Sequence, residues 1–439
     1  MHTAADVLRR ALSAAGVGAL YGRALPGIEV TEVADPTVAV LLAQAHRSVS
    51  GMAAAAHVGD GNLVVPGSRL EGGPVPALPS AHLVVADATT LCTLAPVVAE
   101  ASRGVGLQVQ LDVDLSAPAP DGAVERPASA AGWMDADDAL GDIPSRGTVV
   151  VLAGPGVVQD GAVGGLRALA AAGRLGVLNT WGAKGVFHWQ SRHHWATVGL
   201  QELDFELGGL GSADLVLVTG LDEREAPARL WAQYPYRVVA PGALAPLAER
   251  WPDGGSFPDL PPLRSRLAAV TQAGWAATGV PLMPSLVTQH YARVLGDGGL
   301  VAADPGTAGY WVARTFATTR LGSASVPAAP IRGWAAACAT VARLAAPLRP
   351  VLAVVDGPID STTAAVLDAA SELGVGVGVE AWTPDGPPLG PDEHLTRLDV
   401  LAGSGGVSML GTDLRQIDEM VAVAGPVRAW TPDAANSVA

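Results

Sequence analysis

Short runs that are apolar on both sides and stop abruptly at glycine or aspartate recur along the whole 439-residue chain. Examples are "TVVVLAG", "ADLVLVTG", "GLVAADPG" and "PVLAVVDG". A continuous apolar run of this length indicates a strand buried on both faces, which is typical of a parallel sheet covered by helices. Helical patterns follow these runs, so the sequence predicts repeated βα units and an α/β fold.

Two stretches rich in proline, glycine or alanine divide the βα units into three blocks. "SAPAPDGAVERPASAAG" follows the first block, and "RWPDGGSFPDLPPLRSR" follows the second. Stretches of this composition are typical of linkers. We therefore expect three parallel-sheet, Rossmann-like domains over residues 1–120, 145–250 and 281–439.

Composition and charge exclude several classes of protein. Although 49% of the residues are hydrophobic, no uninterrupted apolar run approaches the roughly 18 residues of a membrane helix. The net charge of −15 disfavours binding to nucleic acid, whose phosphates require clustered lysine and arginine. Cys92 and Cys338 are the only cysteines, which fits a reducing compartment better than a disulfide framework. We expect a cytoplasmic protein with neither a membrane nor a nucleic acid as its partner.

Several motifs in the second block have both a chemical and a structural interpretation. The turn Gly154-Pro155-Gly156 follows a strand, but Gln159 replaces the third glycine of a dinucleotide loop, and proline lacks an N–H donor. A tight turn is the simpler interpretation. Lys184 is the only lysine in the chain and therefore the only candidate side chain for Schiff-base chemistry.

The segment "FHWQSRHHW" contains His188, His193 and His194. No pair has the i, i+4 spacing of a helix-borne zinc site, and no acidic residue lies among them. A surface loop or a subunit contact is the simpler interpretation.

Two carboxylates follow apolar strands in the third block. Asp356 ends "VLAVVD", and Asp304 follows "GLVAA" with Gly306 close behind. In open α/β sheets, ligands and metal ions bind at the carboxyl ends of the strands. A site role and a helix-capping or turn role are both open for Asp304.

The order of these pieces resembles the thiamine-diphosphate-dependent enzymes, the group of acetolactate synthase and the 2-oxoacid decarboxylases. "ALSAAGVGALYGRALPG" resembles the start of the family's first domain, and "LGVLNTWGAKGVF" and "SADLVLVTGLD" resemble its central domain. "GLVAADPGTAGYWVAR" and "IRGWAAACATVARLAAPLRPVLAVVDG" resemble its cofactor domain. The resemblance covers nearly the whole chain and implies domains of pyrimidine, central and diphosphate type, in that order.

The resemblance also implies a set of site residues. Thiamine diphosphate would be held near Asp304, Gly306, Gly333 and Gly357, and Asp356 would bind the Mg²⁺ that clamps the cofactor's diphosphate. The family also uses a glutamate of the first domain to activate the cofactor. Here the equivalent position falls on Pro36, so the neighbouring Asp35 is the candidate catalytic residue.

The chain departs from the family pattern at three cofactor contacts. Val355 replaces a glycine of the metal motif, Ala381 and Trp382 replace the asparagines that should complete the metal site, and the activating glutamate is missing. Glu380 is adjacent, but a strand residue one place from Ala381 points to the opposite face.

We therefore expect a protein that keeps the fold, has lost ordinary cofactor-dependent catalysis, and acts as a binding, regulatory or partner subunit. The alternative is an active thiamine-diphosphate- and Mg²⁺-dependent 2-oxoacid decarboxylase or carboligase with an atypical site. A third hypothesis places a nucleotide in the central domain near Gly154, Gly156 and Lys184. The resemblance implies a homodimer or tetramer, and a hetero-partner subunit could complete the site.

Overall fold

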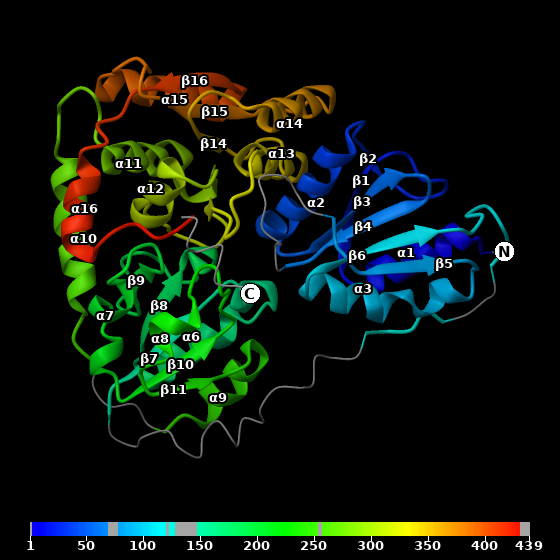
Figure 1. The fold of residues 1–439 in the computed structure, drawn as a ribbon, viewed down its shortest axis with the longest axis horizontal. Helices are drawn as coiled ribbons and strands as arrows, with labels where there is room; N and C mark the ends of the chain where they lie inside the picture. The colour runs from blue at the N-terminus through cyan, green and yellow to red at the C-terminus, as the bar shows by residue number, and fades with distance from the viewer. Residues whose placement is uncertain (1, 69–77, 120–122, 128–146, 253–256, 431–439) are drawn as a thin grey trace. The chain divides into compact units, whose positions relative to one another are not determined.

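The computed structural model describes residues 2–68, 78–119, 123–127, 147–252 and 257–430. The protein is an α/β protein with three sheets (Figure 1), which confirms the fold class expected from the repeated βα pattern. The second and third sheets are entirely parallel, whereas the first is mixed. The expectation of three parallel sheets was therefore wrong for the first sheet.

The chain forms two compact units. Unit 1 comprises Met1–Ala131, Ile331–Pro347 and Ile359–Val377. Unit 2 comprises Gly132–Pro330, Leu348–Pro358 and Gly378–Ala439, and it contains both the second and the third sheet.

Unit 1 is built on a sheet with the strand order β2-β1-β3-β4-β6-β5. Its elements are α1 (Ala4–Ala14), β1 (Val17–Gly22), β2 (Thr31–Glu32), α2 (Pro36–Ser50), β3 (Ala53–Gly59), β4 (Asn62–Pro66), β5 (His82–Val85), η1 (Thr90–Thr93), α3 (Leu94–Arg103), β6 (Gly106–Leu111), α13 (Trp334–Ala345) and α14 (Ser361–Glu372). Helices α1 and α3 share one apolar cluster with side chains of the sheet. Helix α2 packs against β1 and β3, and α13 packs against α2.

The mixed sheet of unit 1 follows from one very short connection. Only Asp60 and Gly61 separate β3 from β4, and both have positive φ angles, 48° and 71°. A parallel pair needs a crossover of about a dozen residues or more, so a two-residue turn forces β4 to run antiparallel to β3. Strand β4 then pairs antiparallel with β6 as well.

Helices α13 and α14 belong to unit 1, although the strands between and after them in sequence, β14 and β15, belong to unit 2. Helix α13 has the alanine-rich sequence "WAAACATVARLA", and ten of its twelve residues are buried. Alanine side chains permit close approach between helices, which accounts for the tight packing of α13 on α2.

The second sheet has the parallel order β11-β10-β7-β8-β9. Its elements are β7 (Val149–Ala153), α5 (Gly156–Gln159), α6 (Val163–Gly173), β8 (Gly176–Thr180), η2 (Trp181–Ala183), β9 (His194–Val198), α7 (Asp204–Leu207), η3 (Leu210–Ser212), β10 (Leu215–Thr219), α8 (Ala228–Trp231), β11 (Tyr236–Val238), η4 (Pro241–Ala243), α9 (Leu244–Arg250) and α10 (Pro262–Trp275). Alternate residues of β7 contribute to two different apolar clusters, one with α6 and α9 and one with α7 and α10. Burial on both faces explains why these strands are apolar throughout.

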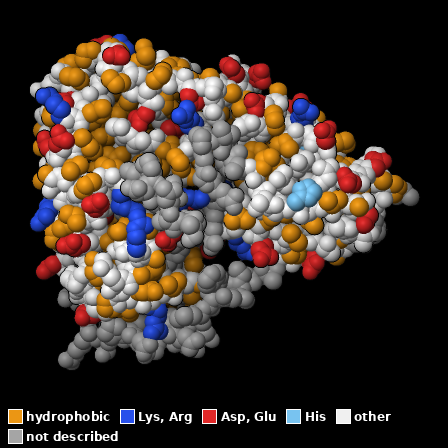
Figure 2. All heavy atoms as spheres, viewed as in Figure 1, with side chains coloured by type: hydrophobic (Ala, Val, Ile, Leu, Met, Phe, Trp, Pro, Cys, Tyr) orange, Lys and Arg blue, Asp and Glu red, His pale blue; other side chains and the backbone are white. Residues whose placement is uncertain are grey.

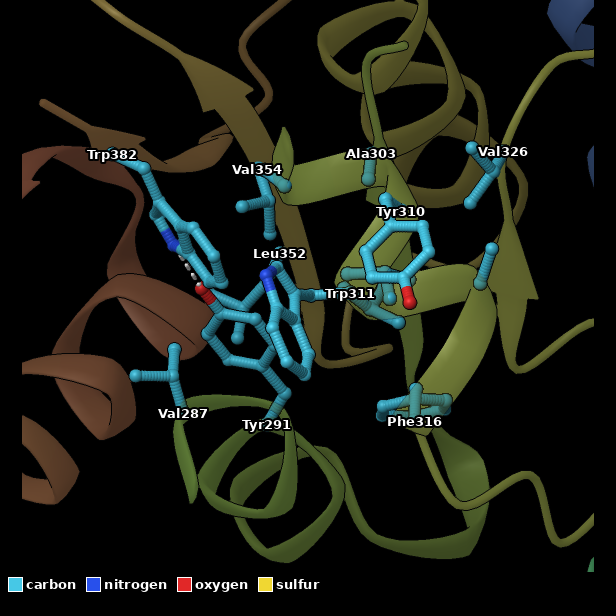
Figure 3. Close-up of a cluster of buried hydrophobic side chains, with 14 of the residues drawn as sticks. Val287, Tyr291, Ala303, Tyr310, Trp311, Phe316, Val326, Leu352, Val354 and Trp382 are labelled. Carbon is cyan, nitrogen blue, oxygen red and sulfur yellow. Dashed lines mark hydrogen bonds between the residues drawn. The ribbon is translucent and has the colours of Figure 1, made fainter. Parts of the chain in front are cut away.

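The third sheet has the parallel order β13-β12-β14-β15-β16. Its elements are α11 (Pro284–Leu295), η5 (Gly296–Gly298), β12 (Leu300–Ala303), α12 (Thr307–Thr315), β13 (Ala324–Ser325), β14 (Val351–Asp356), β15 (Gly378–Trp382), α15 (Pro391–Ser404), β16 (Gly406–Leu410) and α16 (Gln416–Ala424). Side chains of β12, β14 and β15 form one cluster with α11, α12, α15 and α16. Figure 3 shows the part of this cluster between the strands and helices α11 and α12.

A buried ion pair joins the second and third sheets within unit 2. The Nη2 atom of Arg314 on α12 lies 2.8 Å from both carboxylate oxygens of Asp204 on α7, and both side chains are almost completely buried. Arg314 also donates to the carbonyl oxygen of Thr197 at 2.7 Å. The backbone N–H groups of Leu200 and Gln201 donate to the Oδ2 atom of Asp204. These hydrogen bonds help to offset the free-energy cost of burying the carboxylate.

Two further observations concern the helices and the surface. None of the helices in the described part of the chain combines the length and the apolar character needed to cross a membrane. Aspartate and glutamate side chains are spread over the visible face rather than gathered in one region (Figure 2).

The buried pair yields a stability prediction. Asp204→Ala leaves the Arg314 guanidinium buried without its counter-charge, so we expect the free energy of unfolding to fall by about 3–5 kcal/mol. Glu393→Ala is the control, because Glu393 pairs with Arg397 at 2.9 Å on an exposed helix face, where such pairs contribute at most about 0.5 kcal/mol. Urea denaturation of both variants measures the difference, and equal effects would contradict the prediction.

Candidate functional site

The carboxyl edge of the third sheet brings together four of the residues that the sequence identified. Asp356 is the last residue of β14, and Gly357 follows it. Asp304 and Gly306 lie in the turn between β12 and α12. Strands β12 and β14 are parallel neighbours, so their carboxyl ends meet at one edge.

The Asp356 carboxylate caps helix α12. Its Oδ1 atom accepts a hydrogen bond from the backbone N–H of Ala308 at 2.8 Å, and its Oδ2 atom accepts one from the N–H of Thr307. The first N–H groups of a helix have no partner within the helix, and a carboxylate there also interacts favourably with the helix dipole. The residue retains contact with solvent, yet partial burial raises the pKa of Asp356, and the two N–H donors oppose that rise.

The two glycines of this edge are required by the backbone. Gly306 has φ +126°, and a Cβ atom there would lie 2.2 Å from the Oδ2 atom of Asp356. Gly357 has φ +73°, and its N–H donates to the carbonyl oxygen of Trp382 at 2.7 Å. Both glycines therefore have a structural role that does not involve a ligand.

Asp304 is buried at the beginning of the same turn, with 7% of its surface exposed. Its N–H donates to the carbonyl oxygen of Val354 at 2.9 Å. A Cβ atom on Gly309 would lie 2.3 Å from the carbonyl oxygen of Asp304, so the first turn of α12 passes very close to this residue. The sequence predicted Asp304 at a strand end and left a site role and a capping or turn role open, and the residue lies directly after β12.

The remaining two candidates, Asp35 and Gly333, lie in unit 1. The Oδ1 atom of Asp35 accepts hydrogen bonds from the N–H groups of Thr37 and Val38 at 2.7 and 3.2 Å, and it therefore caps helix α2. Gly333 precedes α13 with φ +73°, a conformation that disfavours other residues. The structure gives Asp35 a capping role that explains its residue type without reference to catalysis.

Strand β15 supplies an aromatic side chain where the resemblance requires a metal ligand. Trp382 is the register partner of Asp356 in the neighbouring strand, but its indole is 4% exposed and lies within the apolar cluster. The Nε1 atom of Trp382 donates to the hydroxyl oxygen of Tyr291 at 2.8 Å (Figure 3). Ala381 is also buried and has no polar side-chain atom.

A buried polar network that the sequence did not reveal lies beneath this edge. Glu380 on β15 is fully buried; its Oε2 atom accepts from the hydroxyl of Tyr291 on α11, and its Oε1 atom lies 2.9 Å from Nε2 of His394 on α15. The Nδ1 atom of His394 lies 2.8 Å from Nδ1 of His290 on α11. The network connects α11 and α15 to β15 by hydrogen bonds. It also orients Tyr291, whose hydroxyl accepts the hydrogen bond from the indole of Trp382.

The contacts of the network form one chain of hydrogen bonds. The hydroxyl of Tyr291 donates to one oxygen of Glu380, and the second oxygen lies against Nε2 of His394. The Nδ1 atoms of the two histidines then share one hydrogen bond, in which one ring donates and the other accepts.

Burial shifts the pKa of two network members. Burial lowers the pKa of His290 to about 4, and the neighbouring His394 adds to the shift. Burial and the adjacent Glu380 raise the pKa of Tyr291 well above its ordinary value. At neutral pH both side chains are uncharged.

The residues at the sheet edge do not fit the metal centre that the resemblance implies. Mg²⁺ takes hard oxygen ligands in near-octahedral geometry. Both Asp356 oxygens already accept backbone N–H groups, and the last two residues of β15 offer no side-chain oxygen. Among the residues that the structure describes, no group of three or more histidine, cysteine, aspartate or glutamate side chains could hold a metal ion.

The turn after β7 also lacks free donors for a nucleotide phosphate. The N–H of Gly154 donates to the carbonyl oxygen of Thr219 at 2.9 Å, and the N–H of Gly156 donates to that of Gly220 at 2.8 Å. A Cβ atom on Gly154 would lie 2.4 Å from the Gly220 oxygen. The glycines thus allow two turns to pack closely, which agrees with the tight-turn interpretation.

The histidine-rich segment holds separate structural contacts. The Nδ1 atom of His188 accepts from the N–H of Gln190 at 3.1 Å, and Nδ1 of His193 lies 2.9 Å from the carbonyl oxygen of Leu175.

The comparisons with known proteins add no family assignment. No protein-family model matches the chain, and no curated protein sequence matches it either. The resemblance to thiamine-diphosphate-dependent enzymes rests on the motifs alone.

The polar network was missed because its members are distant in sequence and lie on three elements. His290 and His394 are 104 positions apart. The one available signal was Glu380, a charged residue inside the apolar strand "VGVGVEAW". A charge in a strand buried on both faces requires a buried partner, but the strand does not identify that partner.

The capping role of Asp356 yields the first prediction for this site. Asp356→Ala removes the acceptor for two N–H groups of α12, so we expect the free energy of unfolding to fall by about 1–2 kcal/mol. Asp356→Asn keeps one acceptor oxygen and should lose less. Asp399→Ala, at an exposed position of α15, is the control and should change stability by less than about 0.5 kcal/mol. An unchanged Asp356→Ala protein in urea denaturation would refute the capping role.

The neutral His290 yields a prediction on pH dependence. Between pH values of about 4 and 6.5, the unfolded chain binds a proton at this histidine and the folded chain does not. The free energy of unfolding therefore falls as the pH is lowered through this window, by up to about 3 kcal/mol. His290→Gln cannot bind this proton and should show a shallower pH dependence in urea denaturation. His82→Gln, at an exposed position, should leave the slope unchanged; an identical slope in all three proteins would contradict the prediction.

Proposed function

We propose that this protein has the architecture of a thiamine-diphosphate-dependent enzyme, has lost ordinary cofactor-dependent catalysis, and acts as a binding, regulatory or partner subunit. The observation that carries the proposal is the use of the Asp356 carboxylate as the cap of α12. Each oxygen of the residue that would hold the metal accepts a backbone N–H group of this helix.

The neighbouring strand supports the proposal independently. Trp382 points its indole into the apolar cluster and donates to Tyr291, so restoring an oxygen ligand at this position would also open the core. The Glu380 network holds that arrangement in place from beneath. Such a core is adapted to an aromatic residue at the end of β15.

The first domain supports the same conclusion from its own residues. Asp35 is the only candidate there for the activating carboxylate, and its Oδ1 atom accepts two N–H groups of α2. Aspartate is also one methylene shorter than the glutamate of the resembling family, and a displacement of about 1 Å can reduce a rate about a hundredfold. Asp356 and Asp35 thus cap helices, and Trp382 fills the core where the resemblance implies a metal ligand.

Calorimetric titration with thiamine diphosphate and Mg²⁺ tests the proposal. We expect no binding tighter than about 10 µM, which corresponds to roughly 7 kcal/mol. Thermal denaturation gives a second measurement, because a ligand at a hundred times its Kd would stabilise the fold by about 2.7 kcal/mol. Neither signal should appear.

The matched variant for this experiment is Asp356→Asn, which retains an oxygen for α12 but loses the charge. Tight binding by the wild-type protein that Asp356→Asn abolishes would overturn the proposal. Cofactor-dependent consumption of pyruvate with the same sensitivity would instead establish the active decarboxylase or carboligase. Wild type and variant should both be inactive on 2-oxoacids.

A further inference from the structure

The outer strand β16 (Gly406–Leu410) gives the third sheet an unpaired edge. It pairs with β15 on one side, and no strand of the described chain lies on its other side (Figure 1). The other outer strands are shorter or covered: β2 and β13 have two residues each, β11 has three and β5 has four, whereas β9 is almost entirely buried. A long unpaired edge is a template for a further strand unless something blocks it.

The backbone groups of two β16 residues face away from the sheet. The N–H of Thr383 donates to the carbonyl oxygen of Leu410 at 3.0 Å, so the backbone groups of Leu410 face β15. Because the direction of these groups alternates along a strand, those of Val407 and Met409 face outward.

The residues on either side of this outward-facing pair are already bonded. The N–H of Gly405 donates to the carbonyl oxygen of Leu401 at 3.0 Å, and the N–H of Gly411 donates to that of Pro387 at 3.2 Å. The free edge of β16 is therefore confined to residues 407–409.

The side chains of the same two residues form an apolar surface. Val407 is 55% exposed and Met409 is 54% exposed. Their register partners on β15, Val379 and Ala381, are buried. The cover on this face of the sheet thus ends at β15 and leaves two large apolar side chains in water.

The sequence of β16 contains none of the usual protections of an edge strand. Such strands are normally blocked by lysine, proline, a charge or a bulge. No charged residue and no proline lies between Asp399 and Asp413, and the register of β16 with β15 is regular. Copies of a chain with a net charge of −15 repel one another, but at this segment they can meet without a contact between like charges.

We propose that β16 pairs antiparallel with β16 of a second copy of this chain, about a two-fold axis at Ser408. Val407 then exchanges N–H···O=C hydrogen bonds with Met409 of the second copy, and Met409 exchanges them with its Val407. The contact is isologous and closes as a pair. It involves neither Asp356 nor the cofactor contacts, so it goes beyond the function proposed above, and it assigns a surface to an association that the resemblance left unplaced.

The free groups of the edge select this register. A pairing centred on Val407 would place Met409 opposite Gly405. A pairing centred on Met409 would place Val407 opposite Gly411. Both glycines have occupied N–H groups, so the pairing centred on Ser408 is the one that uses both free residues of each copy.

The side chains are complementary in the same register. Directly opposite residues of an antiparallel pair lie on one face, so Val407 covers Met409 of the second copy. On the other face the two Ser408 side chains meet, and serines in such positions form hydrogen bonds. After rotation about its χ1 bond, the Ser408 hydroxyl would gain the partner that it lacks in the described part of the chain.

Sedimentation equilibrium of the full chain measures the association. A contact between two five-residue strands falls at the low end of specific interface sizes. We therefore expect a Kd of about 10–100 µM, and a series from about 1 to 300 µM protein should show the apparent mass rising. A constant apparent mass over this range would overturn the proposal.

Met409→Lys tests whether β16 is the surface involved. It places a charge opposite Val407 of the second copy and should raise the Kd at least about tenfold. Val97→Lys is the matched control, because Val97 is exposed on α3 of unit 1, and it should associate like the wild type. Both positions are exposed, so both variants should fold, and urea denaturation checks this. Equal association of Met409→Lys and wild type would refute the pairing.

Ser408→Cys tests the register itself and does not depend on a disruptive variant. Opposite Cα atoms at the axis should lie about 4.5 Å apart, within the roughly 4.4–6.8 Å that a disulfide spans. Oxidation by copper phenanthroline should therefore link two copies. Val407→Cys is the control, because its two copies would lie diagonally, about 7–8 Å apart.

Non-reducing electrophoresis reads out the cross-link. The wild type gives the background from Cys92 and Cys338. No linked dimer of Ser408→Cys above that background, or equal linking of Ser408→Cys and Val407→Cys, would overturn the proposed register. Calorimetric titration with the cofactor does not involve β16, so failure of the function proposed above and failure of this pairing are distinguishable.

Discussion

Parallel strands place their carboxyl ends at one edge of a sheet. In the third sheet of this protein, side chains at that edge form hydrogen bonds within the fold. The carboxylate of Asp356 reaches from the end of β14 to the first N–H groups of α12. The position of α12 in turn determines where Arg314 meets Asp204 and where Tyr310 and Trp311 enter the core (Figure 3). A residue in the place of a metal ligand thus supports the packing of unit 2.

The other candidate residues also make contacts within the fold at positions where the resemblance implies contacts with a cofactor. Gly306 and Gly357 allow backbone conformations that the turns require, and Asp35 caps a helix of unit 1. Trp382 fills the core where an oxygen ligand would be needed, and Tyr291 satisfies its indole N–H. Each contact stabilises the fold, and the proposed loss of cofactor-dependent catalysis would account for these residues together.

Two buried acidic side chains of unit 2 receive hydrogen bonds from several elements. Asp204 and Glu380 each have several protein donors, and their removal is expected to expose uncompensated polar groups. In both cases the fold itself supplies the hydrogen-bond donors that a buried carboxyl group needs.

The sequence by itself determined the α/β class, because strands buried on both faces must be apolar throughout and therefore produce a pattern that is readable without structure. It also located Asp304 and Asp356 at strand ends, since an apolar run that stops at a carboxylate marks the end of a strand. Only the tertiary structure decided the mixed first sheet, where the two-residue β3–β4 turn sets the strand direction. The partners of Asp356 and Glu380 were likewise settled only by folding, because they lie on separate elements and local patterns carry no information about such contacts.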